Sequence, residues 1–336
     1  MLAAEPLLIW TDPPRELLGF LASYLPLGAL GFQFGVLWPA LRSGGPGRDV
    51  LGSASHRAAV IGLVGTLCGA LVVLIAILGR ASMTNLGFTD TVILMRGPIV
   101  QRLWLLALTT IGFTLVLARL QAGWFLSAVG MLWIQLGGIA ILFTKRWMGM
   151  ANSLHVFGGS LWLGTLFVMM VAGVGAAFAT GGDTPDRDAA VGLLVRKFSA
   201  IALFGAGLLG VSGVITAWRH LHRWSSLWTT PYGFALDAKL LVVLSIVTLG
   251  YYHWRKAGPG LTTPEAVKSF KVTAWRELKL AGLVLLITSV LVSLPSPRFR
   301  PEGGPGGPGR PGAERPQGPQ RGGPEGAPRP GGGDHD

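Results

Sequence analysis

The sequence has little cysteine and little charge. Cys68 is the single cysteine in 336 residues, so the chain can form neither an internal disulfide nor a cluster of thiolate ligands. Charged residues make up 13% of the sequence, about half of what a soluble protein carries, while half of all residues are hydrophobic. The sequence also lacks a phosphate-binding glycine loop, an ATP motif and any Ser/His/Asp arrangement at workable spacing. We therefore expect no enzymatic activity.

Long apolar runs dominate instead. A helix that crosses a hydrocarbon core of ~30 Å needs about 20 apolar residues. Runs of this length occur eight times, at residues 17–38, 57–79, 100–119, 122–143, 152–178, 198–218, 232–254 and 275–294. The predicted fold class is therefore all-α, a polytopic transmembrane bundle of about eight helices. The net charge of +12 lies mostly between these runs, so the expected partner is membrane lipid and not nucleic acid.

The basic residues between the runs predict the orientation, because cytoplasmic loops are enriched in Lys and Arg. With eight spans, the side that holds both termini carries eight basic residues outside the tail, and the other side carries twelve. Both termini are thus predicted to be extracytoplasmic. The runs also suggest three parts: a four-helix half at 1–150, a second four-helix half at 151–297, and a Gly/Pro-rich tail at 298–336. The tail has too few large apolar residues to form a core, and we predict that it is disordered.

Residues 145–171 form the most unusual stretch, because they place His155 in an apolar run near four of the eight methionines. A helix from about residue 152 puts His155 and Met169 on one stripe. Met148 and Met150 lie just before it. Thioether and imidazole groups together suit copper as ligands. The candidate copper ligands in this stretch are therefore His155, Met148, Met150 and Met169. In the alternative interpretation the methionines are packing residues and His155 bonds a neighbouring helix.

The loop after the sixth run contains His220 and His222, separated by one residue. Such a pair can chelate a metal if the backbone is extended, and we include both among the candidate copper ligands. Because arginines flank the pair, the loop is equally consistent with contacts to lipid headgroups.

Several polar side chains fall inside the apolar runs. Asp237, Lys239 and Glu277 are candidates for a functional role, because charges inside a membrane are costly. The amides of Gln33 and Gln135 are expected to hydrogen-bond each other across helices. A stripe of small residues in the sixth run, Ala206, Gly210, Gly213 and Ala217, predicts close packing of that helix on the fifth.

Four pieces of the second half resemble the copper resistance D (CopD) family of membrane proteins. They are SLHVFGGSLWLGTLF, RKFSAIAL with the later Ser-Gly, TTPYGFALDAKL, and WRELKLAG followed by SLPSP, and they occur in the family order over residues 152–297. The resemblance implies an eight-span protein of the bacterial inner membrane that takes part in copper uptake. His155, Lys239 and Glu277 stand at matching motif positions.

Two other functions remain open. The first is a membrane cytochrome in which His155 and either His220 or His222 hold a haem as axial ligands. The second is a non-catalytic accessory subunit bound to other membrane subunits. In the copper interpretation, the few His and Met residues of the outer loops suggest that a separate extracytoplasmic copper-binding protein delivers the ion.

Overall fold

The protein is helical throughout the part of the chain that its structure describes. The computed structural model describes residues 12–44, 51–84, 87–94, 96–140, 147–179, 185–221, 225–252 and 264–294. Every regular element within these ranges is a helix, which confirms the predicted all-α class. The predicted disordered tail at 298–336 lies outside the described residues.

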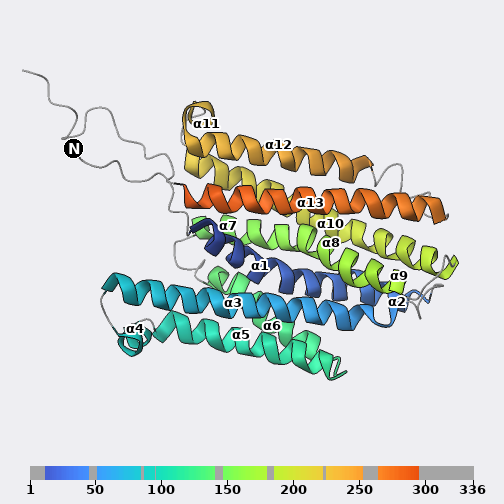
Figure 1. The fold of residues 1–336 in the computed structure, drawn as a ribbon, viewed down its shortest axis with the longest axis horizontal. Coiled ribbons are helices and arrows are strands. Elements are labelled where there is room, and N and C mark those ends of the chain that lie inside the picture. The colour runs from blue at the N-terminus through green and yellow to red at the C-terminus, as the bar shows by residue number, and fades with distance from the viewer. Residues whose placement is uncertain are drawn as a thin grey trace, which may run out of the picture. The chain divides into compact units, whose positions relative to one another are not determined.

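The first four apolar runs each coincide with a helix (Figure 1). The first run forms α1 (Asp12–Gly31), which continues through a π-helical segment, η1 (Phe32–Leu37), into α2 (Trp38–Arg42). The next three runs form α3 (Ala54–Thr84), α5 (Arg96–Leu117) and α6 (Gly123–Ala140), with the short α4 (Phe88–Leu94) between α3 and α5.

The last four runs are helical as well. The fifth run forms a nearly continuous helix with two π-helical segments, made of α7 (Trp147–Gly159), η4 (Ser160–Gly164), α8 (Thr165–Val168), η5 (Met169–Val174) and α9 (Gly175–Ala179). The remaining helices are α10 (Pro185–Leu221), the short α11 (Ser226–Thr229), α12 (Pro231–Tyr252) and α13 (Pro264–Ser293).

Six helices in the described ranges are long and apolar enough to cross a membrane, which makes this a multi-pass membrane protein. They are Asp12–Arg42, Ala54–Thr84, Ile99–Leu117, Met150–Ala179, Pro185–Trp218 and Pro231–Tyr251. Of the other two predicted spans, α6 has a shorter apolar part, Gly123–Gly137, and α13 carries several charged residues in its first half.

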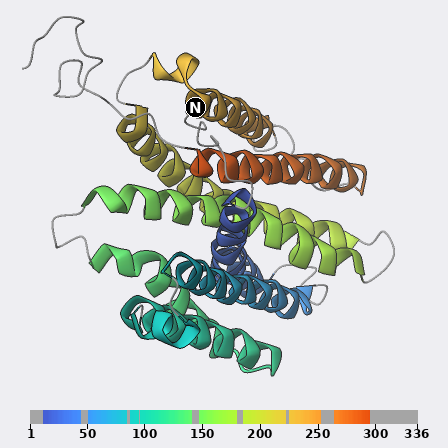
Figure 2. The ribbon, with the colours of Figure 1, turned by 60° about the vertical axis from the view of Figure 1, so that its left-hand side comes forward.

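Helix α1 lies at the centre of the bundle, with α3 on one side and the α7–α9 helix on the other (Figures 1 and 2). Glycines allow both approaches. A side chain at Gly28 would clash with the backbone of Gly164, and one at Gly65 would clash with Pro26. Residues 1–297 form one compact unit. Contacts of α1 therefore cross the predicted boundary at residue 150, and the division into two halves stays a prediction.

The main core includes the π-helical segments η1 and η5. Phe32 of η1 and Met169 of η5 are fully buried there, together with Phe113, Trp124 and Met131. A π-helical turn inserts an extra residue and so changes which side chains face a neighbouring helix. The three π-helical segments found in the described ranges all lie in the two central helices, where packing is closest.

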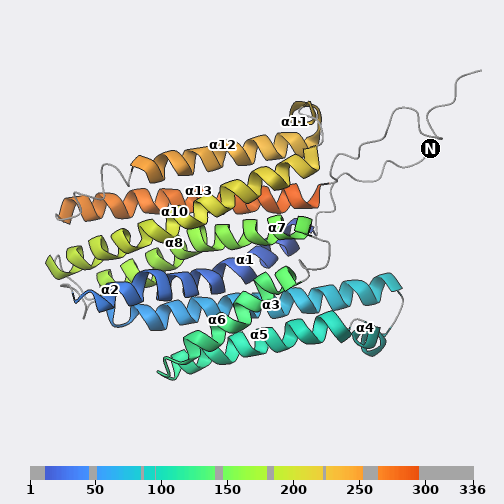
Figure 3. The ribbon, with the colours of Figure 1, turned by 180° about the vertical axis from the view of Figure 1, so that it is seen from behind.

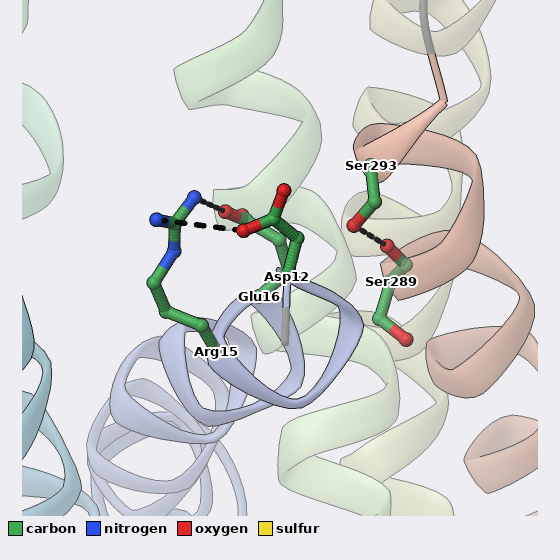
Figure 4. A network of polar contacts seen from close by, with 5 residues as sticks. All are labelled: Asp12, Arg15, Glu16, Ser289 and Ser293. Carbon is green, nitrogen blue, oxygen red and sulfur yellow. Dashed lines mark hydrogen bonds and ion pairs between the residues drawn. The ribbon is translucent and has the colours of Figure 1, made fainter. Parts of the chain in front are cut away.

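The remaining helices pack around this centre in antiparallel pairs, with α6 against α5, α10 against α7 and α13 against α12 (Figure 3). At the beginning of α1, Arg15 bonds Glu16 at 3.1 Å and approaches Asp12 at 3.7 Å. Figure 4 shows this group near the last turns of α13, where the Ser293 hydroxyl donates to the carbonyl of Ser289. Each of these contacts lies within one helix, and the two helices also pack against each other.

Candidate metal site

His155 lies on the face of α7 that packs against α10. Its Nδ1 atom is 3.1 Å from the carbonyl oxygen of Leu209 and 3.5 Å from the hydroxyl oxygen of Ser212. The Ser212 hydroxyl itself donates to backbone carbonyls one turn earlier in α10, including that of Leu209 at 3.2 Å. A carbonyl oxygen can only accept a hydrogen bond, so Nδ1 of His155 is the donor. In a neutral imidazole, this leaves the Nε2 lone pair available for a metal.

Glycine at position 213 leaves the space that the imidazole ring occupies. An added Cβ at Gly213 would lie 3.0 Å from Cε1 and 3.2 Å from Nδ1 of His155, closer than most real Cβ contacts. Further along the same interface, Gly158 of α7 and Gly205 of α10 bring the two backbones together, and a Cβ at Gly158 would lie 2.8 Å from the carbonyl oxygen of Gly205. The two helices therefore cross at glycines, and His155 reaches the α10 backbone directly.

The predicted packing of the sixth run on the fifth is confirmed, but the predicted position within the stripe is wrong. Gly210 is exposed, and an added Cβ there would meet no other atom within 4 Å. The face of α10 that contacts α7 instead contains Gly205, Leu209, Ser212 and Gly213. Successive positions in this set are four, three and one residues apart, so they lie on one side of the helix. Gly210 lies on a different side.

A second interhelical hydrogen bond lies next to His155 on α7. The Gln135 side chain of α6 donates from Nε2 to the carbonyl of Ser153 at 3.3 Å. The expected bond between Gln135 and Gln33 is therefore not formed. Gln33 is 8% exposed, and its Oε1 atom has no hydrogen-bond partner among the described residues. Gln135 and Leu209 thus fix α7 from two sides close to His155.

Lys239 lies on α12, which shares an apolar cluster with α7. Val156, the neighbour of His155, and Val242, three residues after Lys239, belong to one apolar cluster that joins α7 to α12 and α13. Asp237 is half-buried and lines a groove with Leu240, Leu241 and Leu244. Two residues apart on a helix, Asp237 and Lys239 point in different directions, as the sequence indicated.

Glu277 lies in the first half of α13 and is only 7% exposed. It is one turn before Ala281, which belongs to the apolar cluster that also contains Val156. A buried carboxylate at this depth is unusual. The functional role that the sequence suggested for Glu277 stays a prediction.

Of the predicted methionine ligands, Met169 lies far from His155 along the helix. Met169 is fully buried in the main apolar core, about 21 Å further along the helix at 1.5 Å per residue. Met150 is half-buried and lies five residues before His155 on α7. Met148 lies on the same helix two turns before His155, but its side chain is outside the described part of the structure. Whether any of these thioethers joins the imidazole stays a prediction.

The backbone of His220 is offset from the contact of His155 with α10. His220 belongs to the last turn of α10, seven residues after Gly213, which is about 10 Å along the helix. Its side chain and the whole of His222 lie outside the described residues. Axial ligation of haem needs two histidines at similar depth on facing helices, and this offset of His220 from His155 does not favour it.

No preformed cage of harder ligands surrounds His155. Among the described residues, no group of three or more His, Cys, Asp or Glu side chains could hold a metal ion. What the described structure offers is a single imidazole whose Nδ1 donates to a backbone carbonyl. Such an arrangement suits weak and exchangeable binding more than storage of a metal.

Comparison with known proteins identifies the second half of the chain. Residues 192–291, from α10 to the end of α13, match the family described as "Copper resistance protein D". The copper transport protein CutJ of Bacillus subtilis (strain 168) is 27% identical over 161 residues, which is 48% of this chain. The aligned part is only 28% of the length of CutJ. No solved structure matches the chain. The matched family region includes Ser212, Lys239 and Glu277, whereas His155 precedes it.

Proposed function

Because residues 192–291 match the CopD family, we propose that this chain carries copper ions through its helix bundle into the cytoplasm. The match to a copper transport protein supports copper as the transported ion. In this proposal copper is the substrate, and His155 is the first intramembrane residue that binds it.

The observation that carries this proposal is the hydrogen bond from His155 to the carbonyl of Leu209. Metal-binding histidines commonly donate their second ring N–H to a carbonyl or carboxylate, which fixes both the tautomer and the direction of the free nitrogen. His155 lies eight residues after the beginning of α7, about 12 Å into the helix. An ion at that depth has left bulk water, and the oriented imidazole of His155 would replace part of its lost hydration.

Lys239 supports transport more than tight binding. In this proposal, its positive charge opposes a cation that binds the free ring nitrogen of His155. A carrier needs sites that are favourable enough for entry but weak enough for release. We propose that Lys239 keeps copper at His155 exchangeable.

The further path is proposed from the chain order. Met169 and Met170 lie about 21 Å beyond His155 along the same helix and are almost fully buried, so copper that reached them would have crossed much of the bilayer. Soft thioethers bind Cu(I) and exchange it readily. The outer residues Met148, Met150, His220 and His222 are proposed to receive the ion from a separate extracytoplasmic copper-binding protein.

The proposed topology has eight spans with both termini outside the cytoplasm. Helix α6 has 18 residues, about 27 Å of helix, which is close to the thickness of a hydrocarbon core. Helix α13 packs against α12 and α1, and its residue Glu277 is buried. Under this topology, the start of α7, and with it His155, is nearer the outer face.

Replacement of His155 by Asn tests the proposal in cells. We expect normal abundance in the membrane, a melting temperature within a few degrees of the wild type, and loss of copper accumulation. Normal copper accumulation by a stable His155→Asn protein would reject His155 as a ligand. A matched Gln135→Leu protein removes the other hydrogen bond to α7 and should keep most of the copper accumulation.

A further inference from the structure

A second group of charged residues lies at the other end of the bundle, about 34 Å from His155 along the central helix. The ring of Phe178 on α9 contacts two cations from different helices. The guanidinium carbon of Arg187 is 4.7 Å from the ring centroid, and the Nζ atom of Lys271 is 4.0 Å from it. Cations bind aromatic faces at such distances. The chain thus holds two positive charges around one ring.

A third cation reaches the same turn of α9. Arg57, in the first turn of α3, extends its side chain to Gly175, where an added Cβ would lie 3.4 Å from its Nη1 atom. Gly175 and Phe178 are three residues apart and therefore neighbours on the helix surface. Arg57, Arg187 and Lys271, here called the basic cluster, come from three helices that have no proximity in sequence.

Among the described residues, one carboxylate forms an ion pair with the basic cluster. Asp188 accepts hydrogen bonds from Nε of Arg187 at 3.0 Å and from Nη2 at 2.7 Å, and both residues are 3% exposed. This pair fixes the position of Arg187. Lys271 and Arg57 form no ion pair with any residue that the structure describes. Asp186, in the same turn of α10, is exposed.

The basic cluster lies where a membrane surface would be. It surrounds the end of the apolar helix Met150–Ala179 and the beginnings of Ala54–Thr84 and Pro185–Trp218. Lipid phosphates are found at this level of a bilayer, and basic pockets between helices bind the headgroups of anionic lipids. Arginine and lysine held in fixed positions are suited to phosphate oxygens.

We propose that the basic cluster is a binding site for a phosphate group. The phosphate belongs to the headgroup of an anionic phospholipid or to inorganic phosphate, and the chemistry of recognition is the same. Arg187 is fixed by Asp188 and Phe178, while Lys271 and Arg57 close on the phosphate from two sides. The site is independent of copper and of the proposed function of His155.

The test uses the full chain in nanodiscs that contain phosphatidylcholine alone or phosphatidylcholine with phosphatidylglycerol. We expect the melting temperature of the wild type to rise with the fraction of phosphatidylglycerol, and the affinity for it to fall about fivefold for each cation removed. An Arg57→Gln/Lys271→Gln protein should lose most of the rise and melt like the wild type in phosphatidylcholine. Arg196→Gln is the matched control, because Arg196 is an exposed residue of α10 that makes no such contact.

A second arm adds inorganic phosphate to phosphatidylcholine nanodiscs, with chloride at the same ionic strength as reference. Stabilisation of the wild type by phosphate, absent in the double variant, assigns the site to free phosphate, whereas a response to phosphatidylglycerol alone assigns it to lipid. Equal responses of wild type and double variant in both arms would overturn the proposal. Should the double variant fail to fold, Lys271→Gln and Lys271→Arg separate charge from packing, and only the Gln variant should weaken binding.

Discussion

The imidazole of His155 on α7 donates a hydrogen bond to the carbonyl of Leu209 on α10, with 3.1 Å between Nδ1 and the oxygen. A backbone carbonyl on a neighbouring helix is a rigid partner, since helix geometry fixes its position. The bond therefore sets both the tautomer and the orientation of the ring. Gly213 makes it possible, because it leaves the ring room beside the α10 backbone.

The first prediction concerns Gly213. In Gly213→Ala the new methyl group would lie 3.0 Å from Cε1 of His155, so the ring must move and the bond to Leu209 must weaken. We expect a loss of about 1–3 kcal/mol in stability and a clear fall in copper transport. Gly210→Ala is the control, because a Cβ there meets no atom within 4 Å. Equal transport in the two variants would contradict the role of Gly213.

The second prediction concerns Lys239. Removal of its charge in Lys239→Gln should strengthen copper binding by about tenfold, because a unit charge near a partly buried site contributes about 1 kcal/mol or more. Release then becomes slower, and net transport should fall while the copper bound per chain rises. Equilibrium binding and transport are measured on the same preparation. Arg102→Gln, at an exposed site on α5, should leave both unchanged, and weaker copper binding in Lys239→Gln would contradict the proposed role.

The third prediction concerns the crossing of α1 and η4. A methyl group at position 28 would clash with the backbone of Gly164. Backbone atoms cannot rotate away as a flexible side chain could, so the two helices would have to move apart. Gly28→Ala should therefore lower the stability by about 1–3 kcal/mol, visible as a lower melting temperature. Gly19→Ala, on the same helix but with no atom near its Cβ, should melt like the wild type. An unchanged melting temperature for Gly28→Ala would show that the helices separate easily at this point.

The fourth prediction concerns Met169, which is fully buried. Met169→Leu keeps the volume of the side chain and removes the thioether, so the loss of stability should stay below about 1.5 kcal/mol. If copper passes Met169 as proposed, transport falls in a protein that folds normally. Unchanged transport would leave Met169 as a core residue only.

Much of the fold could be predicted from the sequence, because run length and apolar composition define a membrane helix without knowledge of its neighbours. Each of the eight predicted runs coincides with a helix. The π-helical segments around Phe32 and Met169 carry no such signal. They result from the packing of α1 on the α7–α9 helix, and a local pattern does not contain that information.

The candidate site could be predicted in part. His155 stood out as a histidine inside an apolar run, but its partner is the carbonyl of Leu209, and a backbone carbonyl is present at every residue. The small-residue stripe indicated that α10 packs on α7, but it placed Gly210 at the contact. Gly210 is exposed, because spacing alone does not determine how a helix is rotated about its axis. The bond from Gln135 to Ser153 and the apolar cluster that joins Val156 to Val242 bring together residues far apart in sequence, which the sequence pattern could not pair.

The most direct test measures copper influx into proteoliposomes that contain the purified chain. Each membrane contains the same amount of protein, and copper influx is expected for the wild type. For His155→Asn, influx should be close to the background of protein-free liposomes. For Gln135→Leu, it should be near the wild-type value. Influx through His155→Asn at the wild-type rate, in a protein with a normal melting temperature, would contradict the account.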